Sequence, residues 1–241
     1  MTRSASSWKK GRKRSPPARN RRALRYAIYY TPAPESALAR FGESWFARKE
    51  PFLDAARRYG FHGTLKAPFR LAKGATEAGL LLAAERFAGE RGALRGPPLR
   101  PAVLAGFLAL MPSEPFGELD RLAADCVASF DGFRAPPGEA ELARRRRAGL
   151  SASQEALLRR WGYPYVMEAF RFHMTLTDRL DEAGLASERA LAGAMLGEAP
   201  APFSVDAVTV MVEPSEGDAF RVLRRFEFAW PAGPLRTAGG P

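Results

Sequence analysis

Two stretches of sequence, YGFHGTLKAPF (residues 59–69) and FRFHMTLT (residues 170–177), guide the interpretation of this chain. The 241 residues include two histidines, and each stands first in a His-x-Thr-Leu tetrapeptide. In an extended strand, residues i and i+2 point to the same face. Each stretch therefore predicts a strand whose polar face carries a histidine and a threonine and whose other face is apolar.

The two predicted polar faces offer the same chemical groups. Their members are His62, Thr64 and Lys66 in the first stretch, and Arg171, His173, Thr175 and Thr177 in the second. Threonine hydroxyls can donate to phosphodiester oxygens, and cations can balance negative charge that grows in a transition state. A histidine pair near neutral pH can supply one neutral base and one protonated acid.

We therefore predict that His62 and His173 are the catalytic pair and that the other residues on these faces bind phosphate. The mechanism requires no metal, and two histidines with one cysteine would make a poor zinc site. We predict that the protein has no metal and no other cofactor, and that its partner is a small phosphodiester substrate. The sequence does not indicate which histidine is the acid.

The charge of the chain is concentrated at its beginning. The net charge is +11, but residues 1–25 hold ten Lys or Arg and no acid, which leaves 27 basic and 26 acidic residues elsewhere. We expect a disordered basic tail over residues 1–22 and a flexible tail over 232–241. The basic tail is consistent with weak, nonspecific nucleic-acid binding, with targeting, or with an extension that has no role; we favour the last.

Cys126 lies among apolar residues at helical spacing, so we expect it in the core and expect no internal disulfide. No apolar run reaches the roughly 20 residues of a membrane span. These features predict a monomeric protein of the reducing cytoplasm that does not contact a membrane.

Between the tails, the sequence predicts one domain, residues 23–231, in two similar halves of about 23–110 and 111–231. Apolar periodicity predicts strands over residues 26–30, 59–69, 102–110, 170–177, 203–212 and 220–230, and helices over 35–47, 76–88, 116–130 and 187–196. Residues 131–166 predict one or two helices and a turn. They could cover the site as a lid, or Arg144–Arg147 could simply be a solvated helix face.

Paired His-x-Thr motifs in two such halves resemble those of the two-histidine phosphoesterases, which include RNA 2′,3′-cyclic phosphodiesterases. The resemblance implies an α+β, bilobal fold in which two pseudo-symmetric, mainly antiparallel sheets flank a central cleft, with helices outside. It also implies that His62 and His173 are the acid and base, and that Thr64 and Thr175 bind the phosphate.

A closer resemblance covers roughly residues 25–180 and includes RYAIYY (25–30), both histidine stretches, FRAP (133–136) and GYPY (162–165). These are similar to a bacterial family encoded among phosphonate-utilisation genes. That context implies 5-phosphoribosyl 1,2-cyclic phosphate as the substrate and ribose 1,5-bisphosphate as the product. A second phosphate needs its own cations; Arg134 and Arg144 are candidates, and Tyr29 and Tyr165 are candidates for the edge of the cleft.

Two alternative functions remain. One is an RNA-end or nucleotide 2′,3′-cyclic phosphodiesterase, which would need an aromatic stacking surface and a basic groove. The other is a non-catalytic nucleotide- or RNA-binding protein. The nearly neutral body argues mildly against a long RNA track, and the presence of both histidines argues against a loss of catalysis.

Overall fold

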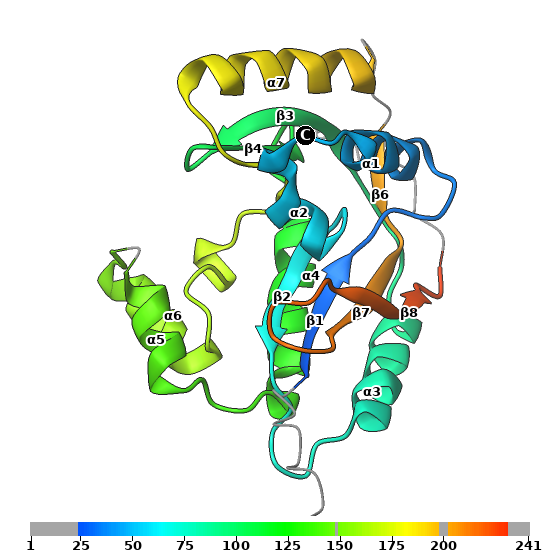
Figure 1. The fold of residues 1–241 in the computed structure, drawn as a ribbon. Helices are drawn as coiled ribbons and strands as arrows, with labels where there is room; N and C mark the ends of the chain where they lie inside the picture. Colours follow the sequence, from blue (N-terminus) through cyan, green and yellow to red (C-terminus); the bar gives the residue numbers. More distant parts are fainter. Residues whose placement is uncertain (1–23, 148, 198–201, 231–241) are drawn as a thin grey trace, which may run out of the picture.

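The computed structural model describes residues 24–147, 149–197 and 202–230 (Figure 1). The predicted tails, residues 1–22 and 232–241, lie outside this part. Eight strands form two four-stranded antiparallel sheets in the described residues, which confirms the predicted α+β class with two mainly antiparallel sheets.

The first sheet has the order β2-β1-β7-β8 and the second has the order β5-β4-β3-β6. The strands of the first sheet are β1 (Arg25–Tyr30), β2 (Gly63–Phe69), β7 (Ala207–Glu213) and β8 (Arg221–Glu227). Those of the second are β3 (Leu94–Leu104), β4 (Phe107–Pro112), β5 (Met174–Arg179) and β6 (Pro202–Val205). The inner strands β1 and β7 are almost continuously apolar and buried, as expected for strands covered on both faces.

The predicted boundary near residue 110 does not separate the two sheets. The hairpin β3–β4 belongs to the second sheet, whereas β7 and β8 return from the end of the chain to complete the first. Alternating apolar segments indicate where strands form but not which strand pairs with which, because pairing depends on the register of distant segments.

Helices cover both sheets (Figure 1). Their bounds are α1 (Ala37–Ala47), α2 (Asp54–Tyr59), α3 (Glu77–Gly89), α4 (Gly117–Ser129), α5 (Glu139–Arg146), α6 (Ala152–Trp161) and α7 (Glu182–Leu196), with 3-10 turns at Pro51–Leu53, Asp131–Phe133 and Met167–Ala169. Helices α3 and α4 pack on the first sheet, and α7 packs on the second. The side chains of Ser36, Thr76 and Asp181 each accept from the backbone at the start of a helix.

Three predicted elements differ from the structure. A hairpin turn at Ala105 and Gly106, both at positive φ, divides the segment predicted as one strand over residues 102–110. Gly60, at φ 76°, ends α2, so the predicted strand over 59–69 begins only at Gly63. Helix α7 begins five residues before the predicted Ser187, because Asp181 caps it.

The two histidine-bearing stretches lead into equivalent strands. β2 is an edge strand of the first sheet, β5 is an edge strand of the second, and these edges contact each other. Helix α1 fixes the second edge through Trp45, whose Nε1 donates to the carbonyl of Leu176 at 3.0 Å. The topology thus brings together two motifs that are far apart in the sequence.

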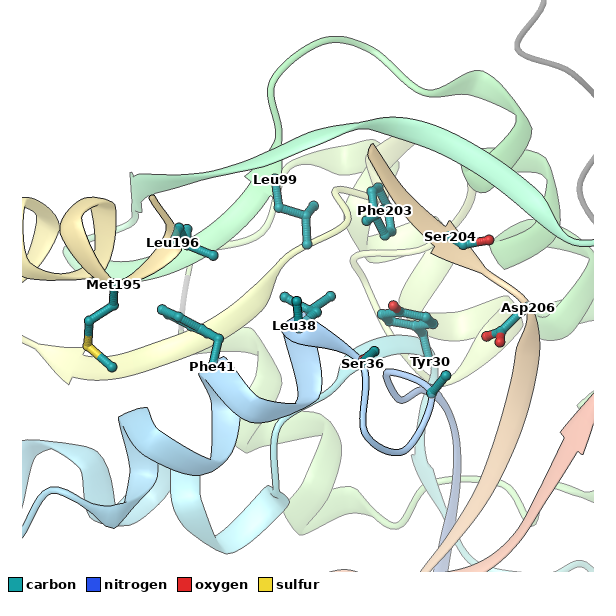
Figure 2. Close-up of a pocket in the computed structure, with 12 residues that line it drawn as sticks. Tyr30, Ser36, Leu38, Phe41, Leu99, Met195, Leu196, Phe203, Ser204 and Asp206 are labelled. Atoms are coloured by element: carbon teal, nitrogen blue, oxygen red, sulfur yellow. The ribbon is translucent and has the colours of Figure 1, made fainter. Parts of the chain in front are cut away.

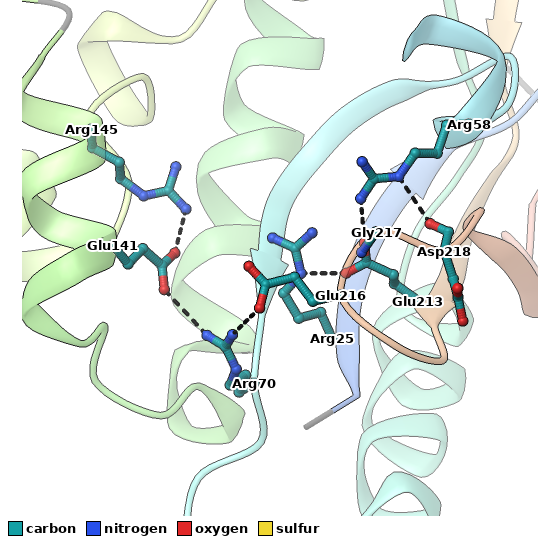
Figure 3. Close-up of polar contacts among 9 residues, drawn as sticks. All are labelled: Arg25, Arg58, Arg70, Glu141, Arg145, Glu213, Glu216, Gly217 and Asp218. Carbon is teal, nitrogen blue, oxygen red and sulfur yellow. Dashed lines mark hydrogen bonds and ion pairs between the residues drawn. The ribbon is translucent and has the colours of Figure 1, made fainter. Parts of the chain in front are cut away.

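Helices α5 and α6 form an arm to one side of the sheets (Figure 1). The arm has a small core of its own, in which Leu157 of α6 packs with Val127 of α4 and with Val166. Ion pairs also hold it: Glu141 of α5 accepts from Arg145 at 2.7 Å and lies 3.5 Å from Arg70, which follows β2 (Figure 3). The predicted helices of residues 131–166 are therefore present and are attached beside β2.

A buried carboxylate at the end of β7 links this strand to β1 and α2. Glu213 is fully buried and pairs with Arg25 of β1 and with Arg58 of α2, and it also accepts from the backbone of Gly217 (Figure 3). These contacts hold the pKa of Glu213 below its usual value despite burial. The ion pairs join elements from the two ends of the chain.

Candidate active site

Each histidine immediately precedes its strand and is oriented by the same backbone contact. The Nδ1 atom of His62 lies 2.9 Å from the carbonyl oxygen of Gly60, and that of His173 lies 2.8 Å from the carbonyl of Arg171. A carbonyl oxygen can only accept, so each Nδ1 carries a proton. Nε2 is then the atom available for proton transfer on each ring, and in His62 it lies 3.3 Å from Thr64 Oγ1.

The residues beside the two histidines fit closely together. A Cβ atom on Gly63 would overlap the ring of Phe172, so the residue after His62 must lack a side chain. The ring of Phe172 also lies 5.9 Å from Tyr30 and 5.6 Å from Phe203, centroid to centroid. This aromatic cluster thus joins β1 of the first sheet and β6 of the second through the residue that precedes His173.

A cavity of about 380 Å³ opens along these strands. Its polar lining includes Thr64 from β2, His173 from the second motif, and Tyr163 and Tyr165 from the segment after α6. Because Thr64 Oγ1 is also the neighbour of His62, the cavity brings groups from both motifs to one place. The lining also includes two arginines, apolar side chains of the β3–β4 turn, and apolar side chains of β2 and of residues 166–170.

The two histidines differ in their surroundings. His62 stacks on the buried ring of Tyr29 at 3.9 Å, and burial lowers its pKa to about 4 despite the hydrogen bond to Gly60. The nearby charge of His173 lowers that pKa further. Burial also lowers the pKa of His173, which faces the cavity with Phe107 5.8 Å away. Both imidazoles therefore favour the neutral form in the free protein.

Several predicted residues lie together. Thr64 and Arg171 line the cavity with His173, and Tyr165 lines it with a side chain that is 40% exposed. Thr175 is half-buried on β5, two residues after His173. Tyr29 lies behind His62 rather than at the edge of the cleft, because it is only 1% exposed.

Lys66 and Thr177 do not line the cavity, because a register slip in strand pairing follows each motif. The pairing of β1 with β2 slips between Ile28 and Tyr29, and the pairing of β4 with β5 slips between Phe107 and Ala109. Such a bulge interrupts the alternation of faces. Lys66 is consequently 3% exposed and Thr177 1% exposed.

Both buried groups are hydrogen-bonded within the protein. The ammonium of Lys66 donates to the carbonyl of Val127 at 2.9 Å and lies 3.3 Å from Asp131, and burial lowers its pKa to about 8. The hydroxyl of Thr177 accepts from the backbone of Leu108 at 3.0 Å. These contacts replace the predicted phosphate-binding role with a structural one.

Arg134 and Arg144 also lie outside the cavity lining. Arg134 donates to Asp131 at 2.8 Å and to the carbonyl of Arg160 at 3.1 Å, so its guanidinium is occupied. Arg144 is exposed on α5. The prediction that they hold a second phosphate therefore lacks support from their positions.

Arg179 and Phe107 line the cavity but were not among the predicted site residues. Arg179 continues the series of odd positions 171, 173 and 175 along the second stretch, so extending that series by two more steps would have found it. The position of Phe107 depends on the β3–β4 turn, for which the apolar run over 102–110 gives no clear signal.

A second cavity, of about 340 Å³, lies between α1, the end of α7 and the second sheet (Figure 2). Its lining is mostly apolar and includes Phe41, Leu99 and Met195. Among the described residues that line it, the charged one is Asp206, which is paired with Arg225 at 2.6 Å. This cavity does not offer the groups that a phosphodiester requires.

Within the described residues, no group of three or more His, Cys, Asp or Glu side chains could hold a metal ion. None of the described helices has the length and apolar character needed to cross a membrane. Cys126 is buried, and burial raises the pKa of its thiol, as expected for a core residue.

Residues 64–221 match the family described as "Protein of unknown function (DUF1045)", and the chain belongs to this family. The matched range includes the second motif and begins two residues after His62.

Two curated relatives are named "Ribose 1,5-bisphosphate phosphokinase PhnN". The protein from Janthinobacterium sp. (strain Marseille) is 42% identical over 233 residues, which cover 85% of this chain and 51% of the relative. The protein from Laribacter hongkongensis (strain HLHK9) is 40% identical over 220 residues, which cover 83% and 51%. The chain thus spans about half the length of the curated relatives it matches.

Solved structures with a similar arrangement have low sequence identity. E. coli LigT in its apo form gives a TM-score of 0.43 at 16% identity, covering 85% of this chain and 97% of LigT. LigT complexed with 3′-AMP gives 0.44 at 15% identity, covering 85% and 98%. Usb1 of Kluyveromyces marxianus gives 0.35 at 12% identity, covering 84% and 98%.

Proposed function

We propose that this protein is a cyclic phosphodiesterase that uses His62 and His173 as base and acid and needs no metal. The observation that carries the proposal is the equivalent placement of the two imidazoles. Each carries a proton on Nδ1 by donation to a backbone carbonyl, and the two motifs meet beside one cavity that also holds Thr64. Paired imidazoles with hydroxyl and guanidinium groups suit acid–base cleavage of a phosphate ester.

We assign the base to His62 and the acid to His173. His62 stacks on Tyr29, and burial lowers its pKa to about 4, so the ring stays neutral and can accept a proton from water. His173 lines the cavity, where a bound phosphate would favour its protonated form. Water then attacks phosphorus, His62 Nε2 takes its proton, one ring P–O bond breaks, and His173 Nε2–H protonates the departing oxygen.

The substrate that we propose is 5-phosphoribosyl 1,2-cyclic phosphate. Cleavage of the P–O2 bond and addition of one water molecule would give ribose 1,5-bisphosphate. The curated relatives are named for a phosphokinase of ribose 1,5-bisphosphate and are about twice as long as this chain. The 241 residues contain no G-x-x-x-x-G-K-[ST] phosphate loop, so we assign the named kinase activity to the other half of the relatives. The two halves would then catalyse successive steps.

A nucleotide 2′,3′-cyclic phosphodiesterase is the second candidate, because Tyr163 and Tyr165 line the cavity and could stack on a base. Phosphorus NMR distinguishes the two. We expect the purified protein, in EDTA, to open the ribosyl cyclic phosphate, and His62→Ala and His173→Ala each to reduce the reaction strongly. Turnover of cyclic nucleotides alone would favour the second candidate. Turnover that requires an added divalent metal would contradict the metal-free mechanism, and absence of turnover would favour a binding protein.

A further inference from the structure

The charges around the cavity are not balanced. Arg171 and Arg179 line it, and no Asp or Glu is among its lining residues. Both arginines are exposed, and neither forms an ion pair with a carboxylate in the part of the chain that the structure describes. In contrast, Arg134 and Arg145, which do not line this cavity, are both paired with acids. Two guanidinium groups that lack a carboxylate partner among the described residues favour a ligand with more than one negative charge.

The two arginines lie on opposite sides of the catalytic histidine in the sequence. Arg171 is two residues before His173, and its guanidinium donates to the carbonyls of Phe170 at 2.6 Å and Glu168 at 3.3 Å. It is therefore held next to the proposed site of reaction. Arg179 ends β5, six residues after His173, and its side chain is free to contact a more distant part of a ligand.

The register slip in β5 shortens the distance between Thr175 of the motif and Arg179. Thr175 pairs with Ala109, and Arg179 pairs with Phe107, so the two positions lie only two residues apart along β4. Two residues of extended strand span about 7 Å, compared with about 13 Å for the four residues between Thr175 and Arg179 in a regular strand. The bulge that buries Thr177 thus also brings Arg179 toward the motif.

The cavity wall between the motif and Arg179 is mostly apolar. Phe107 pairs with Arg179 at the backbone, and its ring lies 5.8 Å from the ring of His173. Leu104 and Ala105 of the adjoining turn extend this wall. A ligand that fits here has an anionic group at each end and a compact middle part that can contact a phenyl ring, as a pentose carrying two phosphates does.

We propose that Arg179 binds the second phosphate of the substrate and thereby selects sugar phosphates with two anionic groups. The identity of the sugar rests on the proposed function, whereas the need for a second anion rests on the cavity. Arg179 takes the role that the sequence suggested for Arg134 and Arg144. Its forked guanidinium can donate two hydrogen bonds to one phosphate.

Calorimetric titration tests this assignment without requiring turnover. Ribose 1,5-bisphosphate and ribose 1-phosphate are titrated into the wild type, Arg179→Gln and Arg144→Gln at one fixed ionic strength. Arg179→Gln should weaken binding of the bisphosphate by roughly 10- to 100-fold, the size expected for a lost charge-assisted contact, and change binding of ribose 1-phosphate less than about twofold. Arg144→Gln is a matched control on the exposed face of α5 and should change neither.

The outcomes separate the two proposals. An equal loss for both ligands in Arg179→Gln, no loss for either, or equal affinity of the wild type for the two ligands would overturn the assignment of Arg179. Phosphorus NMR of the same variants reports separately on hydrolysis. Selective, Arg179-dependent binding without any hydrolysis would support the second-phosphate site and contradict the proposed reaction.

Discussion

The two His-x-Thr-Leu motifs share the features that orient an imidazole and differ in those that set its charge. In both, Nδ1 donates to the carbonyl two residues earlier, and a register slip buries the residue four positions after the histidine. Tyr29 covers His62, whereas His173 faces the open cavity. The same backbone arrangement can therefore hold two imidazoles with different surroundings, because the neighbours of each ring decide its protonation.

The largest expected effect comes from removing either histidine. His62→Ala and His173→Ala should each reduce hydrolysis of an alkyl cyclic phosphate by roughly 10²- to 10⁴-fold. A p-nitrophenyl phosphodiester distinguishes the two variants, because its leaving group needs no proton. On that substrate His173→Ala should recover much of its activity, whereas His62→Ala should not. Steady-state kinetics on both substrates measure this, and recovery in His62→Ala instead would reverse the assignment of acid and base.

A smaller effect should distinguish Thr175 from Thr177, which the sequence places on one face. Thr175→Val should lower kcat/KM by about 10- to 100-fold through loss of a donor to the phosphate. Thr177→Val should leave kcat/KM within about twofold of the wild type. It should instead lower the free energy of unfolding by about 1–3 kcal/mol, because the backbone N–H of Leu108 loses its acceptor.

Enzyme kinetics and denaturant unfolding of both variants measure these two quantities. A loss of activity in Thr177→Val at unchanged stability would show that this hydroxyl contacts the substrate and that the slip in β5 is misassigned.

The smallest effect concerns the pH dependence of kcat/KM. The base must be neutral, so activity should fall as the pH drops through about 4, the pKa of His62. The acid must be protonated, so activity should also fall as the pH rises through the lowered pKa of His173. Tyr29→Leu lets water reach His62, which raises its pKa and should move the acidic limb up by about one unit.

Phe107→Leu is the matched change beside His173. It should move only the basic limb of the profile, toward higher pH. The pH profiles of both variants, with circular dichroism to confirm folding, measure the two limbs. Movement of the basic limb in Tyr29→Leu would contradict the assignment of His62 as the base.

Local patterns in the sequence predicted much of the fold, and they selected the two histidines on which the proposed site is built. Most helices and the strand character of both stretches follow from apolar periodicity, whereas the α+β class was what the family resemblance implied. Two tetrapeptides of the same His-x-Thr-Leu pattern pointed to His62 and His173. The prediction for Lys66 and Thr177 failed because it assumed an uninterrupted alternation. A bulge depends on how β1 and β4 pair with these strands, and a single strand sequence does not contain that information.

Arg134 was chosen as a phosphate-binding candidate, and Arg179 was missed, for a similar reason. A run of basic residues indicates charge but not its partners, and Arg134 is neutralised by Asp131 only three residues away. Arg179 lines the cavity without a carboxylate partner among the described residues, and its position beside the motif results from the same slip in register. Thr64, Arg171 and His173 do line one cavity, because their positions depend on their own strands alone, and their roles remain proposals.

The strand order has a consequence for the timing of assembly during synthesis. Strand β1 lies between β2 and β7, so it lacks one neighbour until residues 207–213 have been made. The second sheet already has β3, β4 and β5 by residue 179. Both histidines are therefore synthesised well before β7 and β8 can complete the first sheet. The motif that is translated first thus belongs to the sheet that is completed last.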